Sequence, residues 1–344
     1  MVTIKNIAER AGVSIGTVDR VLHNRGNVSK NTEIKVRLAI DTLKYKPNIF
    51  ARNLKLSRDF SFGVLMPEAS QDSKYWQFPD NGIKRAAKEL NKQRVKVAFF
   101  YYDRYSQLSF SQACLRVLEA DLDGLLIAPV LSRIAQEFIE QIPENLPYIF
   151  FDSVIPKSSC LSFIIQDSYL SGRLSAKLMK MIIKEPGTIA AIRVLPEDFH
   201  INERINGFQS FISENNSLSL VIYDAFREKD VTVFHNLTKR IISENKDLKG
   251  IFVSNALTYC VAKYFESAKM NKRIRIIGYD LIEDNRKYLK NGYIDFLISQ
   301  QPEMQGYQGI YTLYRHIVLN EKTPEKIMMP LDIITEENID YYAH

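Results

Sequence analysis

A series of ten short apolar runs, which begins at Phe62 and ends at Ile298, most constrains what this chain can fold into. Each run has the length of a strand, and helical stretches such as 82–90, 172–183 and 201–213 separate them. Buried strands that alternate with helices predict parallel sheets with helices on both faces. The runs are 62–66, 95–102, 124–128, 148–151, 163–165, 189–194, 220–223, 250–253, 274–278 and 296–298.

The length of this region indicates two lobes rather than one sheet. Ten strands in some 280 residues exceed what one compact doubly wound sheet of this kind holds. We divide them near Phe163, with a return crossing near Phe296. Lobe 1 is expected at about 60–162 and 297–322, and lobe 2 at about 163–296 and 323–344. The predicted fold class is therefore an N-terminal all-α head followed by an α/β domain of two doubly wound parallel sheets.

The first 60 residues follow a purely helical pattern. Thr3, Ser14 and Ser29 each precede a helical segment and are expected to be N-caps, and Gly12 is expected to end the first helix. In the third helix, Ile34, Leu38 and Leu43 recur at helical intervals. Two short helices joined by a glycine-containing turn are typical of a helix-turn-helix, whose second helix fits the DNA major groove.

Positive charge is concentrated in the same 60 residues. They carry twelve Lys or Arg and five Asp or Glu, whereas the whole chain of 344 residues has a net charge of +6. The head is thus strongly basic, and the remainder is close to neutral. This asymmetry is the electrostatic footprint of a nucleic-acid-binding module, although a basic solvated tail would give the same count.

The order of residues in the head favours the first interpretation. The string TIKNIAERAGVSIGTVDRVLHNRGNVS, followed by KYKPNIFARNLK, resembles the DNA-binding head of the lactose-repressor (LacI/GalR) family from Thr3 to Leu56. The resemblance implies a homodimeric transcription regulator, more often a repressor, that binds a pseudo-palindromic double-stranded operator. It also implies a helix-turn-helix domain at 1–46, a hinge helix and linker at 47–59, and an effector-binding domain at 60–344.

The family pattern assigns DNA-contacting roles to positions in the head. Ile15, Gly16 and Arg20 match positions that face base edges, and arginine can make a bidentate contact with guanine. Asp19 and His23 depart from the usual Ser and Asn, and each is either a structural surface residue or a change in docking. Positions that match phosphate contacts are Ser14, Thr17, Asn27, Ser29 and Tyr45.

The segment from Pro47 resembles the hinge helix of the family. At about ten residues it is too short to be a stable helix alone in water, so we expect it to form when two copies pack over a minor groove. Leu54 matches the wedge that kinks the duplex, and Asn48, Ala51 and Lys55 match neighbouring contact positions. An ordinary interdomain linker is the alternative.

The remainder resembles the type I periplasmic-binding-protein fold, in which ligands bind beyond the carboxyl ends of the strands. The residues that match ligand positions in sugar-binding relatives combine aromatic rings, carboxylates, amides and one arginine, which suit a sugar or sugar derivative. Tyr75 and Trp76 could instead be core aromatics, Asp167 a helix cap, and Asp280 with Arg204 an ion pair between lobes. The expected ligand residues are Tyr75, Trp76, Asp152, Asp167, Arg204, Asn255, Tyr279, Asp280 and Gln300.

Other classes of protein find less support. The sequence lacks the common nucleotide-binding, esterase and zinc-protease motifs, so we expect no enzyme, catalytic residue, cofactor or metal site. Cys114, Cys160 and Cys260 form no paired motif. With no signal peptide or membrane-spanning run, a cytoplasmic, nucleoid-associated protein is expected. The alternatives are a sugar-capturing transport protein and a metabolic enzyme on a doubly wound fold. The effector, the operator, the direction of regulation, and dimer against tetramer stay open.

Operator affinity should fall steeply with salt because several basic residues of the head displace counterions from DNA. Between about 50 and 200 mM salt we expect a loss of orders of magnitude in the binding constant. Gel-shift titrations across this range measure the slope. A flat response would contradict the electrostatic interpretation of the head.

Overall fold

The computed structural model describes residues 2–22, 26, 28–43, 58–196, 198–214, 217–225, 231–270 and 274–342. The chain divides into two compact units, Met1–Arg58 and Asp59–His344. Each is described by itself.

The first unit contains three helices whose starts follow from their capping residues. The side chain of Thr3 accepts a hydrogen bond from the Asn6 amide, and the hydroxyls of Ser14 and Ser29 accept from amides three residues ahead, at 3.1 and 3.3 Å. Gly12 ends the first helix in the left-handed conformation, with φ of 64°. All four predictions are confirmed. The helices are α1 (Ile4–Ala11), α2 (Ile15–Leu22) and α3 (Lys30–Thr42).

A small core holds these helices together, and its composition corrects one expectation. Ile7 of α1, Val18 of α2 and Val36 of α3 are fully buried in it. Ile34 and Leu38, whose spacing helped to predict α3, are instead 56% and 61% exposed. The apolar period located the helix correctly but indicated the wrong buried face.

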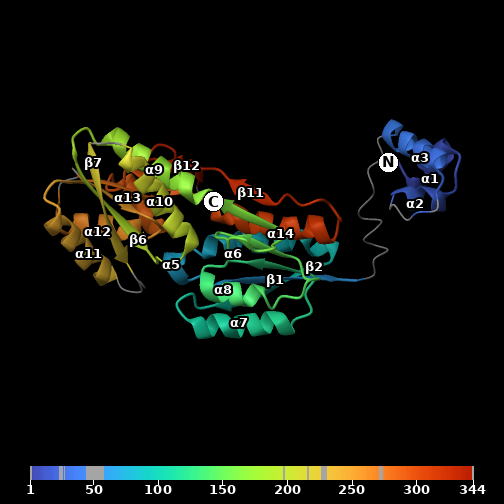
Figure 1. Ribbon diagram of the computed structural model, residues 1–344, viewed down its shortest axis with the longest axis horizontal. Helices are drawn as coiled ribbons and strands as arrows, with labels where there is room; N and C mark the ends of the chain where they lie inside the picture. The colour runs from blue at the N-terminus through green and yellow to red at the C-terminus, as the bar shows by residue number, and fades with distance from the viewer. Residues whose placement is uncertain are drawn as a thin grey trace. The chain divides into compact units, whose positions relative to one another are not determined.

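The second unit contains two six-stranded sheets, which define its two lobes (Figure 1). All neighbouring strands are parallel except β10 and β12. In lobe 1 the order is β11-β5-β4-β3-β1-β2, and in lobe 2 it is β12-β10-β9-β8-β6-β7. The strands of lobe 1 are β1 (Phe60–Pro67), β2 (Val95–Tyr102), β3 (Gly124–Ile127), β4 (Tyr148–Phe151), β5 (Ser162–Gln166) and β11 (Lys326–Met329). Those of lobe 2 are β6 (Gly187–Val194), β7 (Leu218–Ala225), β8 (Leu248–Val253), β9 (Arg275–Tyr279), β10 (Phe296–Ser299) and β12 (Asp332–Ile334).

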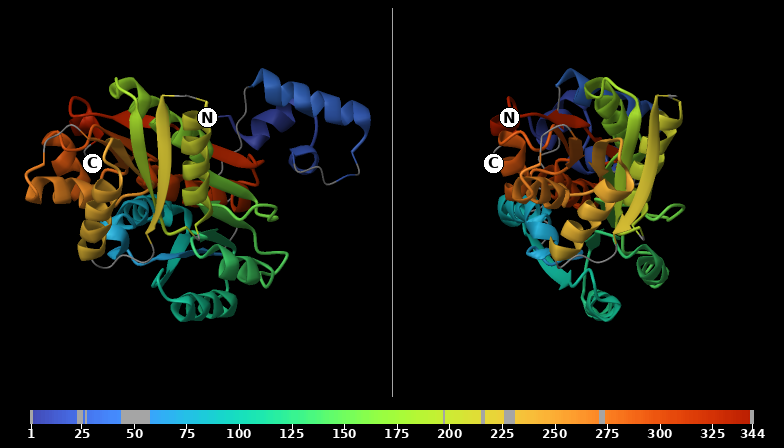
Figure 2. Two further views of the ribbon diagram at one scale, coloured as in Figure 1. Left: turned by 60° about the vertical axis from the view of Figure 1, so that its left-hand side comes forward. Right: turned by 90° about the vertical axis from the view of Figure 1, so that its left-hand side faces the viewer.

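Helices cover both faces of each sheet (Figures 1 and 2), as the alternating pattern predicted. In lobe 1, α6 and α14 pack together on one face and α7 and α8 lie on the other; in lobe 2, α9 and α10 face α11, α12 and α13 across the sheet. Lobe 1 contains α5 (Gln71–Lys74), α6 (Gln77–Leu90), α7 (Gln107–Glu119), α8 (Ser132–Ile139) and α14 (Pro302–Ile317). Lobe 2 contains α9 (Ser168–Ile182), α10 (Phe199–Ser213), α11 (Val231–Glu244), α12 (Thr258–Ser267) and α13 (Glu283–Lys290). Short 3₁₀ turns lie at Asn91–Gln93 and Ile339–Tyr342.

The lobe boundaries differ from those expected at three strands. β5 and β11 pair with each other in lobe 1, although both were assigned to lobe 2, and β10 pairs with β9 in lobe 2 rather than joining lobe 1. The chain crosses between lobes three times, after β5, after β10 and between β11 and β12. The third crossing was expected near 322/323 but lies after β11, because β11 and β12 have four and three residues and lack a continuous apolar run that would place them.

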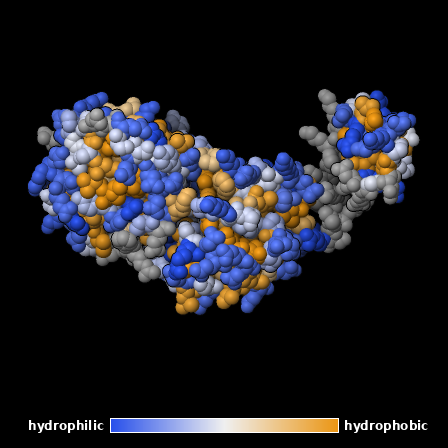
Figure 3. Space-filling model, viewed as in Figure 1, coloured by the Kyte–Doolittle hydropathy of each residue, from blue (hydrophilic) through white to orange (hydrophobic). Residues whose placement is uncertain are grey.

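The outer surface of lobe 1 carries apolar side chains along α7 (Figure 3), where Leu108 and Leu115 are 69% and 58% exposed. Within the described part of the chain, no helix combines the length and the apolar character needed to cross a bilayer.

Two glycines let helix pairs approach at backbone distance. A Cβ at Gly172 of α9 would lie 2.0 Å from the carbonyl oxygen of Arg204 in α10, and a Cβ at Gly82 of α6 would lie 1.9 Å from that of Glu303 in α14. The contact at Gly172 therefore sets where Arg204 lies.

Gly172→Ala should destabilise the second unit by about 1–3 kcal/mol, because the new methyl group forces α9 and α10 apart. Urea denaturation followed by circular dichroism measures the change. Met181→Ala, on an exposed position of the same helix, is the matched control. Equal stability of the two variants would show that the close contact between α9 and α10 does not contribute to the stability of the second unit.

Candidate functional site: a ligand cleft and a DNA-facing helix

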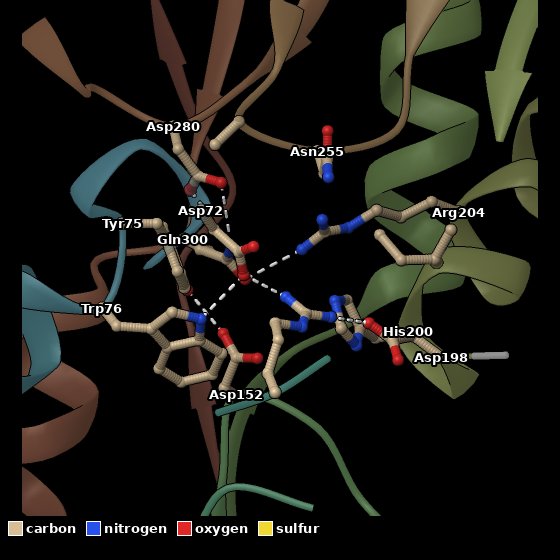
Figure 4. Close-up of a pocket in the computed structure, with 13 residues that line it drawn as sticks. Asp72, Tyr75, Trp76, Asp152, Asp198, His200, Arg204, Asn255, Asp280 and Gln300 are labelled. Carbon is tan, nitrogen blue, oxygen red and sulfur yellow. Dashed lines mark hydrogen bonds and ion pairs between the residues drawn. The ribbon is translucent and has the colours of Figure 1, made fainter. Parts of the chain in front are cut away.

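A polar cleft lies where strands of both sheets end (Figure 4). It encloses about 330 Å³ of empty space, including the part open to solvent. Its lining comes from the segments after β1, β2 and β4 in lobe 1, and after β6, β8, β9 and β10 in lobe 2. The carboxyl ends of parallel strands thus converge on one place, as expected for open α/β sheets.

The lobe 1 side of the cleft combines two aromatic rings with a carboxylate. Tyr75 donates a 2.5 Å hydrogen bond from its hydroxyl to Asp152, and Trp76 packs edge-on against Tyr75 with ring centroids 5.2 Å apart. Trp76 is fully buried, so both aromatics also belong to the core of lobe 1. The core and cleft interpretations of this pair are therefore compatible.

The lobe 2 side is organised by Arg204, which is only 1% exposed. Its guanidinium donates to the Ser254 carbonyl at 2.9 Å and to the Gln300 side-chain oxygen at 2.8 Å. It also lies 3.9 Å from the centre of the Tyr279 ring. The amide of Gln300 in turn donates to Asp280 at 3.0 Å. These contacts fix the donors and acceptors of this wall relative to one another.

The pKa values of two carboxyls of this cleft, Asp280 and Asp152, are raised, so these groups are harder to ionise than usual. Burial raises the pKa of Asp280 to about 7, although Arg204 and Gln300 act in the opposite direction. Burial also raises the pKa of Asp152, against the hydrogen bond from Tyr75. Because each carboxylate lacks full compensation from the protein, hydroxyl donors of a ligand would stabilise its charged form.

Arg104 connects the two lobes across the cleft. Its guanidinium bonds to Asp72 in lobe 1 and to Asp198 at the start of α10 in lobe 2, and all three side chains are at most 8% exposed. Trp76 and Tyr105 also donate to Asp72. Burial opposes the charge on Arg104, but the two carboxylates outweigh it and raise its pKa. The closed arrangement is therefore held by a buried ion-pair network.

The structure brings together most of the expected ligand residues. Seven of them line the cleft: Tyr75, Trp76, Asp152, Arg204, Asn255, Asp280 and Gln300. Asp280 and Arg204 both belong to lobe 2 and connect through Gln300, so they do not form a bridge between lobes. Their role in binding stays a prediction.

Two expected residues lie elsewhere. Tyr279 is buried beneath Arg204, and its hydroxyl bonds to Ser171 at 2.8 Å, so it supports the arginine rather than facing the cleft. Asp167 caps α9 by accepting from the Leu170 amide at 2.8 Å, and it lines a neighbouring cavity instead. The helix-cap interpretation of Asp167 is thus the one that the geometry favours.

The sequence argument missed five cleft residues: Asp72, Arg104, Asp198, His200 and Ile201. Arg104 follows β2 and Asp198 follows β6, so the rule used for the other strands would have found both. Asp72 lies in a left-handed turn with φ of 49°, which no local sequence signal announces. His200 is buried, and burial together with Arg204 and Arg104 lowers its pKa well below the usual value, so it is neutral.

The described part of the head presents α2 to solvent. Ser14, Gly16 and Arg20 are exposed, Ile15 is 53% exposed, and Thr17 is half-buried with its hydroxyl 2.9 Å from that of Ser14. Ser29 is exposed at the start of α3. The other expected DNA contacts, like most of the hinge at 47–59, lie outside the described residues: Asn27, Tyr45, Asn48, Ala51, Leu54 and Lys55.

Comparison with known protein families matches both units. Residues 62–322 match the periplasmic binding protein domain, and residues 3–48 match the bacterial regulatory proteins of the lacI family. The chain belongs to the LacI family. This LacI-family protein is a DNA-binding transcription regulator with a two-lobed domain of the type I periplasmic-binding-protein fold.

Relatives of the LacI-family chain include regulators and sugar-binding proteins. The ribose operon repressor of Lactococcus lactis subsp. lactis (strain IL1403) is 23% identical over 346 residues, which cover 98% of each chain. A structure described as a LacI transcriptional regulator from Bacteroides fragilis has a TM-score of 0.78 and 27% identity, and covers 83% of this chain and all of its own. A transporter solute-binding protein from Burkholderia graminis C4D1M, in complex with D-arabinose, has a TM-score of 0.75 at 22% identity and covers 84% of this chain and 99% of its own. The last similarity establishes the fold alone.

The cleft offers carboxylates but no evident metal centre. Among the described residues, no group of three or more His, Cys, Asp or Glu side chains is placed to hold a metal ion.

Asp280→Asn should flatten the pH dependence of stability. The folded pKa of about 7 exceeds the ordinary value of 3.8, so the stability that Asp280 contributes below pH 4 is lost as pH rises towards 7. The variant should therefore gain about 1–3 kcal/mol over the native protein at pH 8 and little at pH 4. Denaturant titrations at these pH values measure the difference. Asp121→Asn, on an exposed loop, is the control, and identical slopes for both variants would contradict the buried-carboxyl account.

Proposed function

We propose that this LacI-family regulator is controlled by an uncharged sugar or sugar derivative that binds between its two lobes. One observation carries the proposal: the cleft places Asp152, held by Tyr75, opposite the connected set of Arg204, Gln300 and Asp280. Carboxylates and amides can accept from and donate to neighbouring hydroxyls, and aromatic faces suit the C–H side of a sugar ring. The name of the Lactococcus relative, a ribose operon repressor, supports the same class of effector.

The head would bind DNA as part of a homodimer that acts as a repressor on a pseudo-palindromic operator. Exposed residues at the start of α2, together with Arg20, have the position of a recognition helix that enters the major groove. We further propose that the hinge at 47–59 becomes helical when two copies bind one operator, and that Leu54 kinks the central step.

Ligand and DNA binding would be coupled through lobe closure. A ligand in the cleft contacts both sheets, so it binds the closed arrangement more tightly than the open one and shifts the population towards it. A rigid-body rotation of the lobes would change how the two hinge segments of a dimer approach each other.

Arg20→Ala should weaken binding to the specific operator by about 5- to 150-fold, because a bidentate contact with guanine is worth about 1–3 kcal/mol. Gel shifts on DNA upstream of the neighbouring genes, with and without a non-specific competitor, measure this loss. Arg37→Ala removes an equal charge from the exposed face of α3 and is the matched control. Equal losses in the two variants would show that Arg20 contributes charge alone.

A thermal-shift screen tests the class of effector. A true ligand binds the native state and raises the melting temperature in a concentration-dependent way. Monosaccharides should do so, whereas sugar phosphates should not, because the guanidinium groups of Arg104 and Arg204 already bond to acceptors of the protein. If sugar phosphates alone stabilise the protein, the proposed charge of the effector is wrong; if no carbohydrate does, the sugar proposal fails.

A further inference from the structure

A second cavity adjoins the effector cleft. It encloses about 510 Å³ of empty space, again including the open part, compared with about 330 Å³ for the cleft. Asp152 and His200 line both spaces, so they form the border between them. Figure 4 shows His200 beside Asp198 at this edge of the cleft. A ligand that extends past this border enters the second cavity.

Both lobes contribute walls to the second cavity. Lobe 1 supplies the turn at 152–154 after β4, Ile165 of β5 and Met328 of β11. Lobe 2 supplies the first turns of α9 and α10. An occupant would therefore bridge the lobes in the same way as a ligand in the cleft, and it would favour the closed arrangement too.

The walls combine aromatic and acidic side chains. Tyr169 and Phe199 are each 36% exposed, and Met328 is 43% exposed. Asp167 and Glu203 add carboxylates, while no Lys or Arg is among the described residues that line the cavity. Aromatic faces with hydroxyl acceptors, and no cation to attract a phosphate, suit an uncharged hydroxyl-bearing ring.

At the border and next to it lie two polar atoms that lack hydrogen-bond partners in the described part of the chain. His200 Nδ1 and Ser153 Oγ are buried without a hydrogen-bond partner among the described residues, although both residues line the second cavity. Buried polar atoms in native proteins are almost always paired. A modest shift of these side chains would let them form hydrogen bonds with polar atoms of a ligand that crosses the border.

We propose that the second cavity holds the second ring of an uncharged disaccharide whose first ring binds in the effector cleft. This inference rests on the proposed function, because it extends the same site. It makes the effector larger than a single sugar ring.

Isothermal titration of the full chain tests the inference with ribose, glucose, galactose, fructose, maltose, cellobiose, lactose and sucrose. At least one disaccharide should bind tenfold or more tightly than either of its component monosaccharides. If a monosaccharide binds as tightly as every disaccharide, the second cavity is not a sugar subsite. If none of these sugars binds, the proposed function itself fails and the inference fails with it.

Variants then locate the second ring. Phe199→Ala should weaken the disaccharide at least tenfold and reduce its advantage over the monosaccharide, and Glu203→Gln should act in the same direction without changing the volume. Leu170→Ala is the control. It removes an apolar side chain of α9 that is 49% exposed and directly follows the cavity residue Tyr169. If Phe199→Ala and Glu203→Gln both behave like Leu170→Ala, the second ring does not lie here and the inference is overturned.

Discussion

Burial of the Arg204 guanidinium is the constraint on which the ligand cleft depends. Removing a charge of this kind from water is costly unless it finds partners, and here these are a backbone carbonyl, a glutamine oxygen and the face of Tyr279. The Nε atom of Arg204 is buried without a hydrogen-bond partner among the described residues. Each partner comes from a different element of lobe 2. The close approach at Gly172 sets the height of Arg204 above the sheet. Packing between two helices thus determines the position of a polar group in the site.

The two lobes present carboxylates in corresponding ways. Asp152 directly follows β4 in one sheet and Asp280 directly follows β9 in the other, and both adopt a left-handed backbone with φ of 67°. Asp tolerates this conformation better than most residues, and it turns each side chain out of the strand direction. Two similar strand ends, one in each lobe, therefore place two acceptors around the same space.

Sequence reasoning performed well wherever local physics determines the outcome. The strands β2 and β4 were predicted with their observed bounds because both are apolar runs of strand length. β4 is buried throughout, whereas β2 lies at the edge of its sheet and leaves Lys96 exposed. The caps at Thr3, Ser14 and Ser29 were also local. The lobe assignment of β5, β10 and β11 failed because strand pairing is a long-range property, and a four-residue edge strand such as β11 carries little hydrophobic pattern.

In the ligand cleft, too, features determined by local sequence could be predicted, whereas those that depend on long-range contacts could not. Residues placed directly after a strand could be found from the sequence, which accounts for Asp152, Asn255 and Asp280. Arg104 and Asp72 could not be paired in advance, because their contact depends on a left-handed turn in the segment after β1. The pair between Arg104 and Asp198 depends in addition on how one lobe meets the other. Tyr279 was placed at the right strand end, but the pleat of β9 turns its ring beneath Arg204.

The ion pairs of Arg104 affect how much binding free energy an effector must supply to favour the closed arrangement of the lobes. Separating the lobes would leave Arg104 with Asp72 in lobe 1 and expose Asp198 to water, so opening exchanges a buried pair for a solvated carboxylate. Removing one partner from a buried pair costs about 3–5 kcal/mol, and solvation of the freed group returns part of this. A ligand of micromolar affinity has about 8 kcal/mol available, of which only the difference between its closed and open contacts shifts the equilibrium. Because Arg104 already contributes to closure, modest differential binding at Asp152, Arg204 and Asp280 is enough to change the population of the two arrangements.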